Sequence, residues 1–435
     1  MVLVLGFLQF FIIALISVFE FKNKSSVVFL WATLLVMFGI MHMGVSFWGD
    51  RVYSDEVLME ASVFVISFCC LYIFIRLLYK RQLSINKHNF QCQYIYESLL
   101  RQNNYDRFFF AVFLIALFFK IFPFIQNAGS IFLTSWASAR AYSTSLDYVN
   151  SGQLARVCMY SFSGVIALYY IKNDKRWIIC SILLVLQVLL TRNRIEILPL
   201  ICSLASVYIF KNKTIRLKTI LAVFLSGVFI VCIVYSLVIF RHYGNIQTFV
   251  ENFELSDFAF RLQSYLADER GEIGLRKVFY FFLQNDNQFQ NFGKMHTYLR
   301  MFLVYIPTNW SFGLKPNDFA IAMGHAIGMV EGGSTHPTLF GDCYANLGSF
   351  GVLLGIYWAL YANLIDYITL KRKNTTIQIL MFVLNAVVYV VIGRGSVYNG
   401  FWYAAYGIPL LVFIGWLFNN VKLPNYKYVI KLHSK

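Results

Sequence analysis

Apolar runs of about twenty residues recur from one end of the chain to the other, and they limit its fold more than any other feature. Each run is long enough to cross the hydrocarbon core of a bilayer, which is about 30 Å thick. Backbone amides cannot stay unpaired in lipid, and the runs are far longer than a membrane β-strand. The sequence therefore predicts an all-α polytopic membrane protein, and its 13% of charged residues excludes an ordinary soluble domain.

The apolar runs predict about eleven transmembrane helices within one integral membrane domain, residues 1–435. No internal repeat, nucleotide-binding glycine loop or low-complexity linker divides the chain into further units. The expected spans cover approximately residues 2–20, 27–47, 57–79, 107–125, 157–172, 177–191, 195–210, 217–240, 346–370, 376–392 and 400–418.

The distribution of lysine and arginine predicts the orientation of the helices, because these residues collect in cytoplasmic loops. Alternate loops are basic, as between Lys172 and Arg176, whereas the loop from Asp50 to Glu56 is mainly acidic. We therefore expect an external N-terminus, an internal C-terminus and one large external loop, residues 241–345, inserted between two spans.

The formal net charge of +16 is mainly a topology signal and indicates a preference for the anionic surface of a lipid bilayer. It does not predict a nucleic-acid partner. The eight cysteines lie mainly inside apolar runs, without the paired spacing of a metal site or a disulfide framework, so we expect free thiols. The chain has no Asp-X-Asp sequence, and we expect neither an obligatory metal nor a cofactor.

Two tight external turns carry arginine in a chain whose positive charge is otherwise cytoplasmic. One turn holds Arg192 and Arg194, and the other holds Arg394 between two glycines. A guanidinium group matches the oxygens of a phosphate in a bidentate manner. These three arginines are therefore our candidates for binding a diphosphate. The alternative is structural: Arg194 would pair with Glu196, and Arg394 would reach the lipid headgroups.

The end of the large loop carries a titratable histidine, His336, just before an apolar run. An unperturbed histidine has a pKa near 6.5, which suits a general base that accepts a proton from a sugar hydroxyl. Asp342 or Glu196 would orient this histidine or act as the base instead, and His325 is a reserve candidate. The structural alternative is that His336 and Pro337 form an ordinary turn.

Further candidates for binding the substrate come from the same loop. Arg270 and Arg276 lie in a mixed-charge region with interleaved aromatic residues, and Tyr344 and Asn346 follow the histidine. Aromatic side chains stack on the apolar faces of sugar rings, while polar groups bind the hydroxyls. For most charged residues of the loop, the alternative is a solvated helix face.

These motifs give the chain a family resemblance. It resembles the bacterial O-antigen polymerases, also called oligosaccharide repeat-unit polymerases, and more distantly the O-antigen ligases. The resemblance rests on the overall layout, on the arginine turn from Thr191 to Arg194, on the large external loop, and on the segment from Ser334 to Phe340 that runs into Tyr344 to Gly348.

The resemblance implies a glycosyltransferase of the bacterial inner membrane, similar to the lipid-phosphosugar-dependent (GT-C-like) enzymes, with its active site facing the periplasm. Such an enzyme transfers the growing glycan from undecaprenyl diphosphate to the non-reducing end of a new lipid-linked repeat unit. Arg194 matches the family's arginine where the helix begins, and His336 aligns with the histidine of the ligase-like motif. A chain-length regulator would be a candidate partner.

Two other functions stay open. An O-antigen ligase would use the same class of donor with a different acceptor. A transporter of lipid-linked oligosaccharides should show two related halves and charged or broken helices near the middle of the membrane. The sequence favours an enzyme over a transporter, because Lys120 is the one strong cation inside the first apolar runs and is expected to reach the nearer interface.

Overall fold

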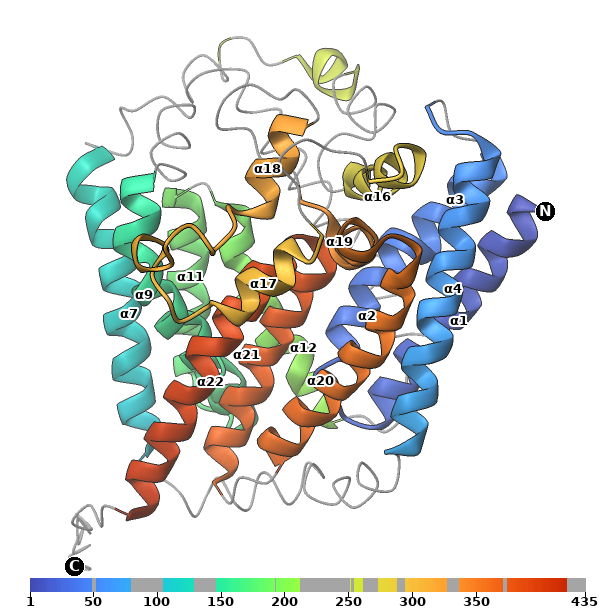
Figure 1. The fold of residues 1–435 in the computed structure, drawn as a ribbon. Helices are drawn as coiled ribbons and strands as arrows, with labels where there is room; N and C mark the ends of the chain where they lie inside the picture. Colours follow the sequence, from blue (N-terminus) through green and yellow to red (C-terminus); the bar gives the residue numbers. More distant parts are fainter. Residues whose placement is uncertain are drawn as a thin grey trace, which may run out of the picture.

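The apolar runs fold into helices that stand side by side in a bundle (Figure 1). The computed structural model describes residues 1–48, 52–79, 105–128, 146–191, 193–211, 251, 254–260, 273–287, 294–326, 336–370 and 374–420. Across these ranges the chain forms helices and turns without a β-strand.

The first half of the chain supplies most of the long helices. They are α1 (Val2–Lys22), α2 (Val28–Leu34), the π-helical η1 (Leu35–Ile40), α3 (Met41–Trp48), α4 (Asp55–Leu78), α7 (Tyr105–Ala128), α9 (Leu146–Phe162), α10 (Val165–Ile171), α11 (Arg176–Thr191), the 3₁₀ turn η3 (Arg194–Ile197) and α12 (Leu198–Lys211).

The second half begins with short helices and returns to long ones. They are η5 (Ile273–Leu275), α16 (Arg276–Gln284), α17 (His296–Phe302), η6 (Thr308–Trp310), α18 (Phe319–Ala326), α19 (Thr338–Leu347), η7 (Gly348–Leu353), α20 (Leu354–Leu370), α21 (Thr375–Arg394) and α22 (Val397–Asn420).

Seven helical stretches of the described residues are long and apolar enough to cross a membrane. The spans expected at 107–125 and 195–210 also form helices, α7 and α12, and the span expected at 177–191 forms the shorter apolar helix α11. The span expected at 217–240 lies outside the described residues. The architecture is that of a multi-pass α-helical membrane protein.

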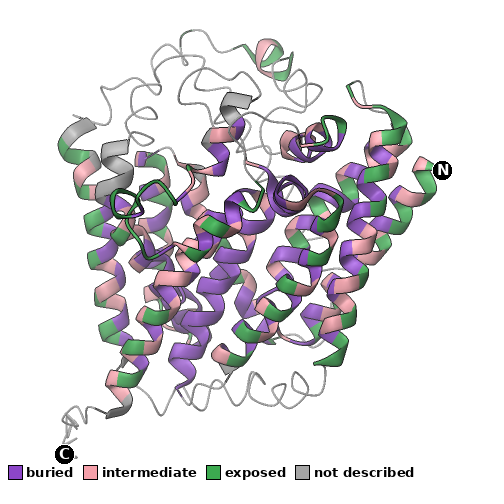
Figure 2. Cartoon of the chain, viewed as in Figure 1, coloured by how far each residue is buried: buried purple, intermediate pink, exposed green. Residues whose placement is uncertain are grey.

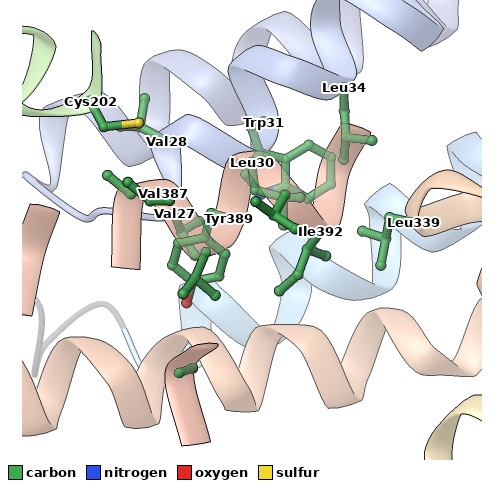
Figure 3. Packing of buried hydrophobic residues seen from close by; sticks show 14 of the residues in the cluster. Val27, Val28, Leu30, Trp31, Leu34, Cys202, Leu339, Val387, Tyr389 and Ile392 are labelled. Atoms are coloured by element: carbon green, nitrogen blue, oxygen red, sulfur yellow. The ribbon is translucent and has the colours of Figure 1, made fainter. Parts of the chain in front are cut away.

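Helix α21 is the centre of the bundle. It is buried along almost its whole length (Figure 2) and packs against α2, α9, α12, α20 and α22. The rings and branched chains around it interlock, as Trp31 and Leu30 do beside Ile392 (Figure 3). Because lipid tails are as apolar as leucine, close packing rather than hydrophobicity has to hold such helices together.

Glycines allow the closest of these contacts. A Cβ atom on Gly164 would stand 2.9 Å from the Cα atom of Leu380, and one on Gly355 would stand 2.6 Å from the carbonyl oxygen of Phe68. The backbones of α20 and α4 therefore approach each other at a distance that only glycine permits. Small residues at helix crossings serve the same purpose in membrane proteins generally.

The two ends of the bundle differ in the way that the charges predict. The N-terminus of α1 lies at the same end as α16 and α18 of the insert, and α22 ends at the opposite end (Figure 1). Helices α1 and α12, whose last residues are Lys22 and Lys211, also end at that opposite end. The insert and the basic helix ends are thus separated by the length of the bundle.

The end of the insert differs from the sequence-based prediction. We expected a loop up to residue 345 and a single helix over 346–370, but α19 already begins at Thr338, and a 3₁₀ turn separates it from α20. Helix α19 is seen nearly end-on in Figure 1, and it packs against α16 and α17. Its residues Asp342, Tyr344 and Asn346 are buried in a helix rather than placed in an open loop.

The sharp junction between α19 and α20 gives a test of the packing. A Cβ atom on Gly351 would stand 2.7 Å from the carbonyl carbon of Cys343, whereas one on Gly415 would only reach ordinary contact with Ile377 at 3.4 Å. We expect Gly351→Ala to lower the free energy of unfolding by about 1–3 kcal/mol or more, as overpacking does. Gly415→Ala should change it little. Thermal unfolding of both purified variants in detergent measures this difference, and equal melting temperatures would contradict the close contact.

Candidate functional site

Glu196 is the centre of a buried polar cluster at the insert end of the bundle. The chain leaves α11 at Thr191, makes the 3₁₀ turn η3, and starts α12 with Pro199 in its first turn, where a proline is tolerated. This tight turn directs the carboxylate of Glu196 inward, and the residue has no exposed surface. Its oxygens accept hydrogen bonds from the side-chain amides of Gln187 and Asn193.

Two cations from other helices pair with this carboxylate. The Nζ atom of Lys120, on α7, lies 3.3 Å from Oε1 of Glu196, and a guanidinium nitrogen of Arg156, on α9, lies 3.1 Å from the same oxygen. Lys120 is fully buried in this pair, so the structure gives it a partner that the sequence did not predict. A Cβ atom on Gly152 would stand 3.1 Å from Nζ of Lys120, which shows that this glycine leaves room for the lysine.

Two tyrosines extend the cluster toward α22. The rings of Tyr160 and Tyr403 form an edge-to-face pair with centroids 4.9 Å apart. Arg156 interacts with both phenols and hydrogen-bonds to Tyr403. Arg394, at the end of α21, is partly buried and interacts electrostatically with Tyr160. Arg394 thus lies at the same end of the bundle as this cluster, within electrostatic reach of Tyr160.

The ionisable side chains of this cluster are mainly cationic. Two basic side chains, Lys120 and Arg156, pair with the one acidic side chain, Glu196, and the basic Arg394 lies at the same end of the bundle. Positive charge in a low-dielectric interior attracts an anion more strongly than the same charge in water. A region of this kind can bind a phosphate or diphosphate group, and the two phenols can add hydrogen bonds to it.

His336 lies beside the turn that follows Arg394, as expected from the sequence. A Cβ atom on Gly395 would stand 3.6 Å from the Cγ atom of His336. The backbone N–H of Thr338 donates to the carbonyl oxygen of Gly395 over 3.1 Å, which fixes this part of the insert against the bundle. Thr338 has φ 64°, an uncommon conformation for a β-branched residue that often marks functional sites.

Asp342 faces α17 and not the histidine. Its Oδ2 atom accepts a hydrogen bond from the hydroxyl of Thr297 at 2.8 Å, and its Oδ1 atom accepts one from the amide of Asn346 at 3.1 Å. The Oδ1 atom of Asn346 in turn accepts from the backbone N–H of Thr297 at 2.9 Å, in the first turn of α17. Both side chains therefore hold α17 against α19.

Helix α17 presents an arginine to the same region. The guanidinium carbon of Arg300 lies 4.4 Å above the ring of Tyr398, which follows the turn of Arg394. His296, at the start of α17, donates through Nε2 to the carbonyl oxygen of Asn317 at 2.7 Å. Burial lowers the pKa of His296, so this tautomer of the neutral ring persists at neutral pH.

Two of the expected substrate-binding residues lie at a different place. The hydroxyl of Tyr344 donates to Glu60 on α4 at 3.4 Å, and its ring packs on Phe64 and Phe279. Arg276 is buried at the start of α16, close to His42. The structure thus places Tyr344 of α19 against α4 and α16, and Arg276 at the start of α16.

Four other residues expected at the site, or their side chains, lie outside the part of the chain that the structure describes. Arg192 and Arg270 lie outside the described residues. Arg194 lies in η3 and His325 lies in α18, but their side chains are not among those that the structure describes. Their proposed roles stay predictions.

Sequence reasoning missed Arg156, Tyr160 and Tyr403, and it gave Lys120 no function. Arg156 stands one residue before the apolar run expected at 157–172, so it looked like a residue of the preceding loop. In the structure α9 begins at Leu146, which places Arg156 inside a helix. The available signal was a cation at the external end of a span, where the charge distribution of the chain disfavours one.

The fold and this cluster define a multi-pass α-helical membrane protein with a buried, mainly cationic site at the end that carries the insert. Comparison of the chain with protein-family models, with curated proteins and with solved structures finds no match. In the part of the chain that the structure describes, no group of three His, Cys, Asp or Glu residues is arranged to hold a metal ion.

The pairing of Glu196 with two cations predicts a large effect of neutralising it. We expect Glu196→Gln to lower the free energy of unfolding by about 3–5 kcal/mol, because Lys120 and Arg156 then repel each other in a buried place. Lys120→Met in the same protein should restore much of the loss. Thermal unfolding of the single and double variants tests this, and a double variant as unstable as Glu196→Gln would contradict the pairing.

The contacts of Asn346 predict a structural effect that does not depend on catalysis. Asn346→Ala leaves the buried N–H of Thr297 without its acceptor, so we expect a loss of about 1–3 kcal/mol of stability. Asn285→Ala, which removes a hydrogen bond from an exposed amide, is the matched control and should have little effect. The measurement is thermal unfolding. Melting temperatures equal to that of the wild type in both variants would contradict the prediction.

Proposed function

We propose that the protein is a surface-polysaccharide polymerase of the bacterial inner membrane that uses undecaprenyl-diphosphate-linked oligosaccharides. The observation that carries the proposal is the buried cluster of Lys120, Arg156 and Glu196 within the bundle. Arg394, within electrostatic reach of Tyr160, and the segment of His336 beside Gly395 lie at the same end of the bundle. A lipid-linked donor brings its diphosphate to the membrane surface and keeps its isoprenoid chain in lipid. The cluster lies at that boundary, between the spans and the insert.

The arginines would bind the leaving group. Transfer breaks the bond between the anomeric carbon of the growing glycan and the diphosphate oxygen, and undecaprenyl diphosphate departs. Positive charge that is already in place stabilises the negative charge that develops on this oxygen, so a general acid is not needed. Arg156, which pairs with Glu196, and Arg394, at the end of α21, are the described arginines that we assign this role, and Arg192 and Arg194 remain candidates from the adjacent turn.

His336 would act as the general base. The attacking hydroxyl, at the non-reducing end of the acceptor, gives its proton to the histidine while its oxygen bonds to the anomeric carbon. Asp342 is a poorer candidate, because Thr297 and Asn346 occupy its two oxygens. Glu196 is a poorer candidate as well, because Lys120, Arg156 and the side-chain amides of Gln187 and Asn193 already occupy its oxygens. Glu196 instead positions Lys120 and Arg156.

One observation favours a transporter of lipid-linked oligosaccharides as a second candidate. Among the described residues, charged side chains are paired inside the bundle around Glu196 and around Arg76. Buried charges in spanning helices are typical of transporters, and the sequence alone did not predict these pairs. The cationic cluster would then bind the same diphosphate during export.

A polymerase and a transporter differ in the surface polysaccharide that cells make when the protein is inactive. We expect Arg394→Ala, Arg156→Ala and His336→Ala to collapse the polysaccharide ladder to a single capped repeat unit, because polymerisation stops while export and ligation continue. Arg176→Ala removes an arginine that pairs with Asp174 away from the site, and it should leave the ladder unchanged. The measurement is a gel of surface polysaccharide from cells with matched membrane abundance of each variant.

Loss of all capped material, including the single unit, would instead indicate export or ligation. An unchanged ladder in the three site variants would exclude this cluster as the reaction site.

A further inference from the structure

A second buried ionic cluster lies near the end of the bundle opposite to the insert. It consists of Glu20 in the last turns of α1, Arg76 in the last turn of α4, and Asp366 near the end of α20. Glu20 and Arg76 have no exposed surface, and Asp366 is 5% exposed. These residues have no part in the proposed transfer reaction.

One guanidinium group binds both carboxylates. Arg76 donates to Oε1 of Glu20 at 2.8 Å through Nε and to Oε2 at 2.5 Å through a terminal nitrogen, which also donates to Oδ2 of Asp366 at 2.8 Å. Its other terminal nitrogen donates to the side chain of Asn363 at 2.5 Å. The hydroxyl of Tyr72 donates to Oε1 of Glu20 at 2.8 Å.

The cluster has more acid than base. Two carboxylates share the positive charge of Arg76, which is the one cation within ion-pair distance of them among the described residues. An uncompensated charge in a low-dielectric interior costs several kcal/mol, and a group in that position usually becomes neutral instead. Glu20 makes the bidentate pair with Arg76, so Asp366 is the carboxylate with the weaker compensation.

We infer that Asp366 binds a proton and that this cluster is a proton-binding site exchanging with the C-terminal face of the bundle. The hydroxyl of Ser25 lies 2.8 Å from Oδ1 and 2.9 Å from Oδ2 of Asp366. Ser25 is the donor to both oxygens in the structure; a proton on Oδ1 reverses that bond and donates to the oxygen of Ser25, while Oδ2 still accepts from Arg76. The side chains of Glu20, Arg76 and Asp366 then all have partners, and the cluster is electrically neutral.

A separate observation supports a polar species at this place. The hydroxyl of Tyr389, on the central helix α21, is buried and has no hydrogen-bond partner among the described residues. It lies close enough to Asp366, Tyr72 and Arg76 to interact with them electrostatically, and Figure 3 shows the ring of Tyr389 within the core. A protonated carboxyl and the water that exchanges its proton are suitable partners for such a hydroxyl.

The described groups that bond to or interact electrostatically with Asp366 are Arg76 of α4, Glu20 of α1, Ser25 of the turn after α1, and Tyr389 of α21. Tyr72 of α4 bonds to Glu20. The side chain of Asp366 is 7% exposed and that of Glu20 is not exposed, so Asp366 is the carboxyl with the easier access to solvent. Protonation there changes the electrostatic attraction between α1, α4 and α20.

The test combines infrared spectroscopy with thermal unfolding of the full-length protein in lipid nanodiscs. We expect wild type to show the C=O stretching band of a protonated carboxylic acid at neutral pH, and Asp366→Asn to reduce it. Asp174→Asn, which alters an ion-paired aspartate in a surface turn, should keep the band. Asp366→Asn should melt close to wild type, because asparagine has the shape of the neutral acid, whereas Glu20→Gln should melt clearly lower.

Three results would overturn the inference. The first is a wild-type spectrum without the band. The second is an equal loss of stability in Asp366→Asn and Glu20→Gln, which would mean that both carboxylates are ionised. The third is a wild-type melting temperature that is higher in sodium chloride than in choline chloride, together with no such difference in Asp366→Asn. This result would identify the bound species as a metal cation and not a proton.

Discussion

Charged side chains inside a helix bundle in lipid must find partners, and this requirement connects most of the structure. Lys120, Arg156 and Glu196 come from three separate segments and meet at the insert end of the bundle. Glu20, Arg76 and Asp366 come from three other helices and meet toward the opposite end. Each pairing fixes the rotation of its helices, because a rotated helix would expose its charge to lipid at a cost of at least about 2.5–3.5 kcal/mol.

The two clusters have opposite character, and this difference suits different ligands. The cluster at the insert end has more cationic than anionic side chains and lies beside His336, which favours a phosphate-bearing lipid. The cluster at the other end has more carboxylates than cations, which favours a proton. Helix α21 connects with both, because its last residue, Arg394, lies at the insert end and its residue Tyr389 is within electrostatic reach of Asp366 and Arg76.

The insert is attached to the bundle by polar contacts as well as by packing. Asn346 and Asp342 of α19 hold the first turn of α17, and α17 carries Arg300 to the ring of Tyr398. The backbone of Thr338 bonds to Gly395 beside His336. Asp342, predicted to take part in catalysis, and Asn346, predicted to bind sugar, thus position helix α17 instead. Their buried oxygens are satisfied within the protein, which makes them poor contacts for a substrate.

The sequence by itself determined the class of fold, the approximate places of most helices and the separation of the two ends. These follow from the length of apolar runs and from the distribution of lysine and arginine, which are local properties of the chain. It also indicated that His336 and Arg394 lie together, since both stand where an apolar run meets the external face. Tertiary structure alone decided that Lys120 is buried, that Arg156 joins Glu196, and that Asp342 faces α17. These pairings depend on how distant helices are rotated against each other, and that rotation is set by close packing at residues such as Gly152 and Gly355, which a single sequence does not encode as a readable pattern.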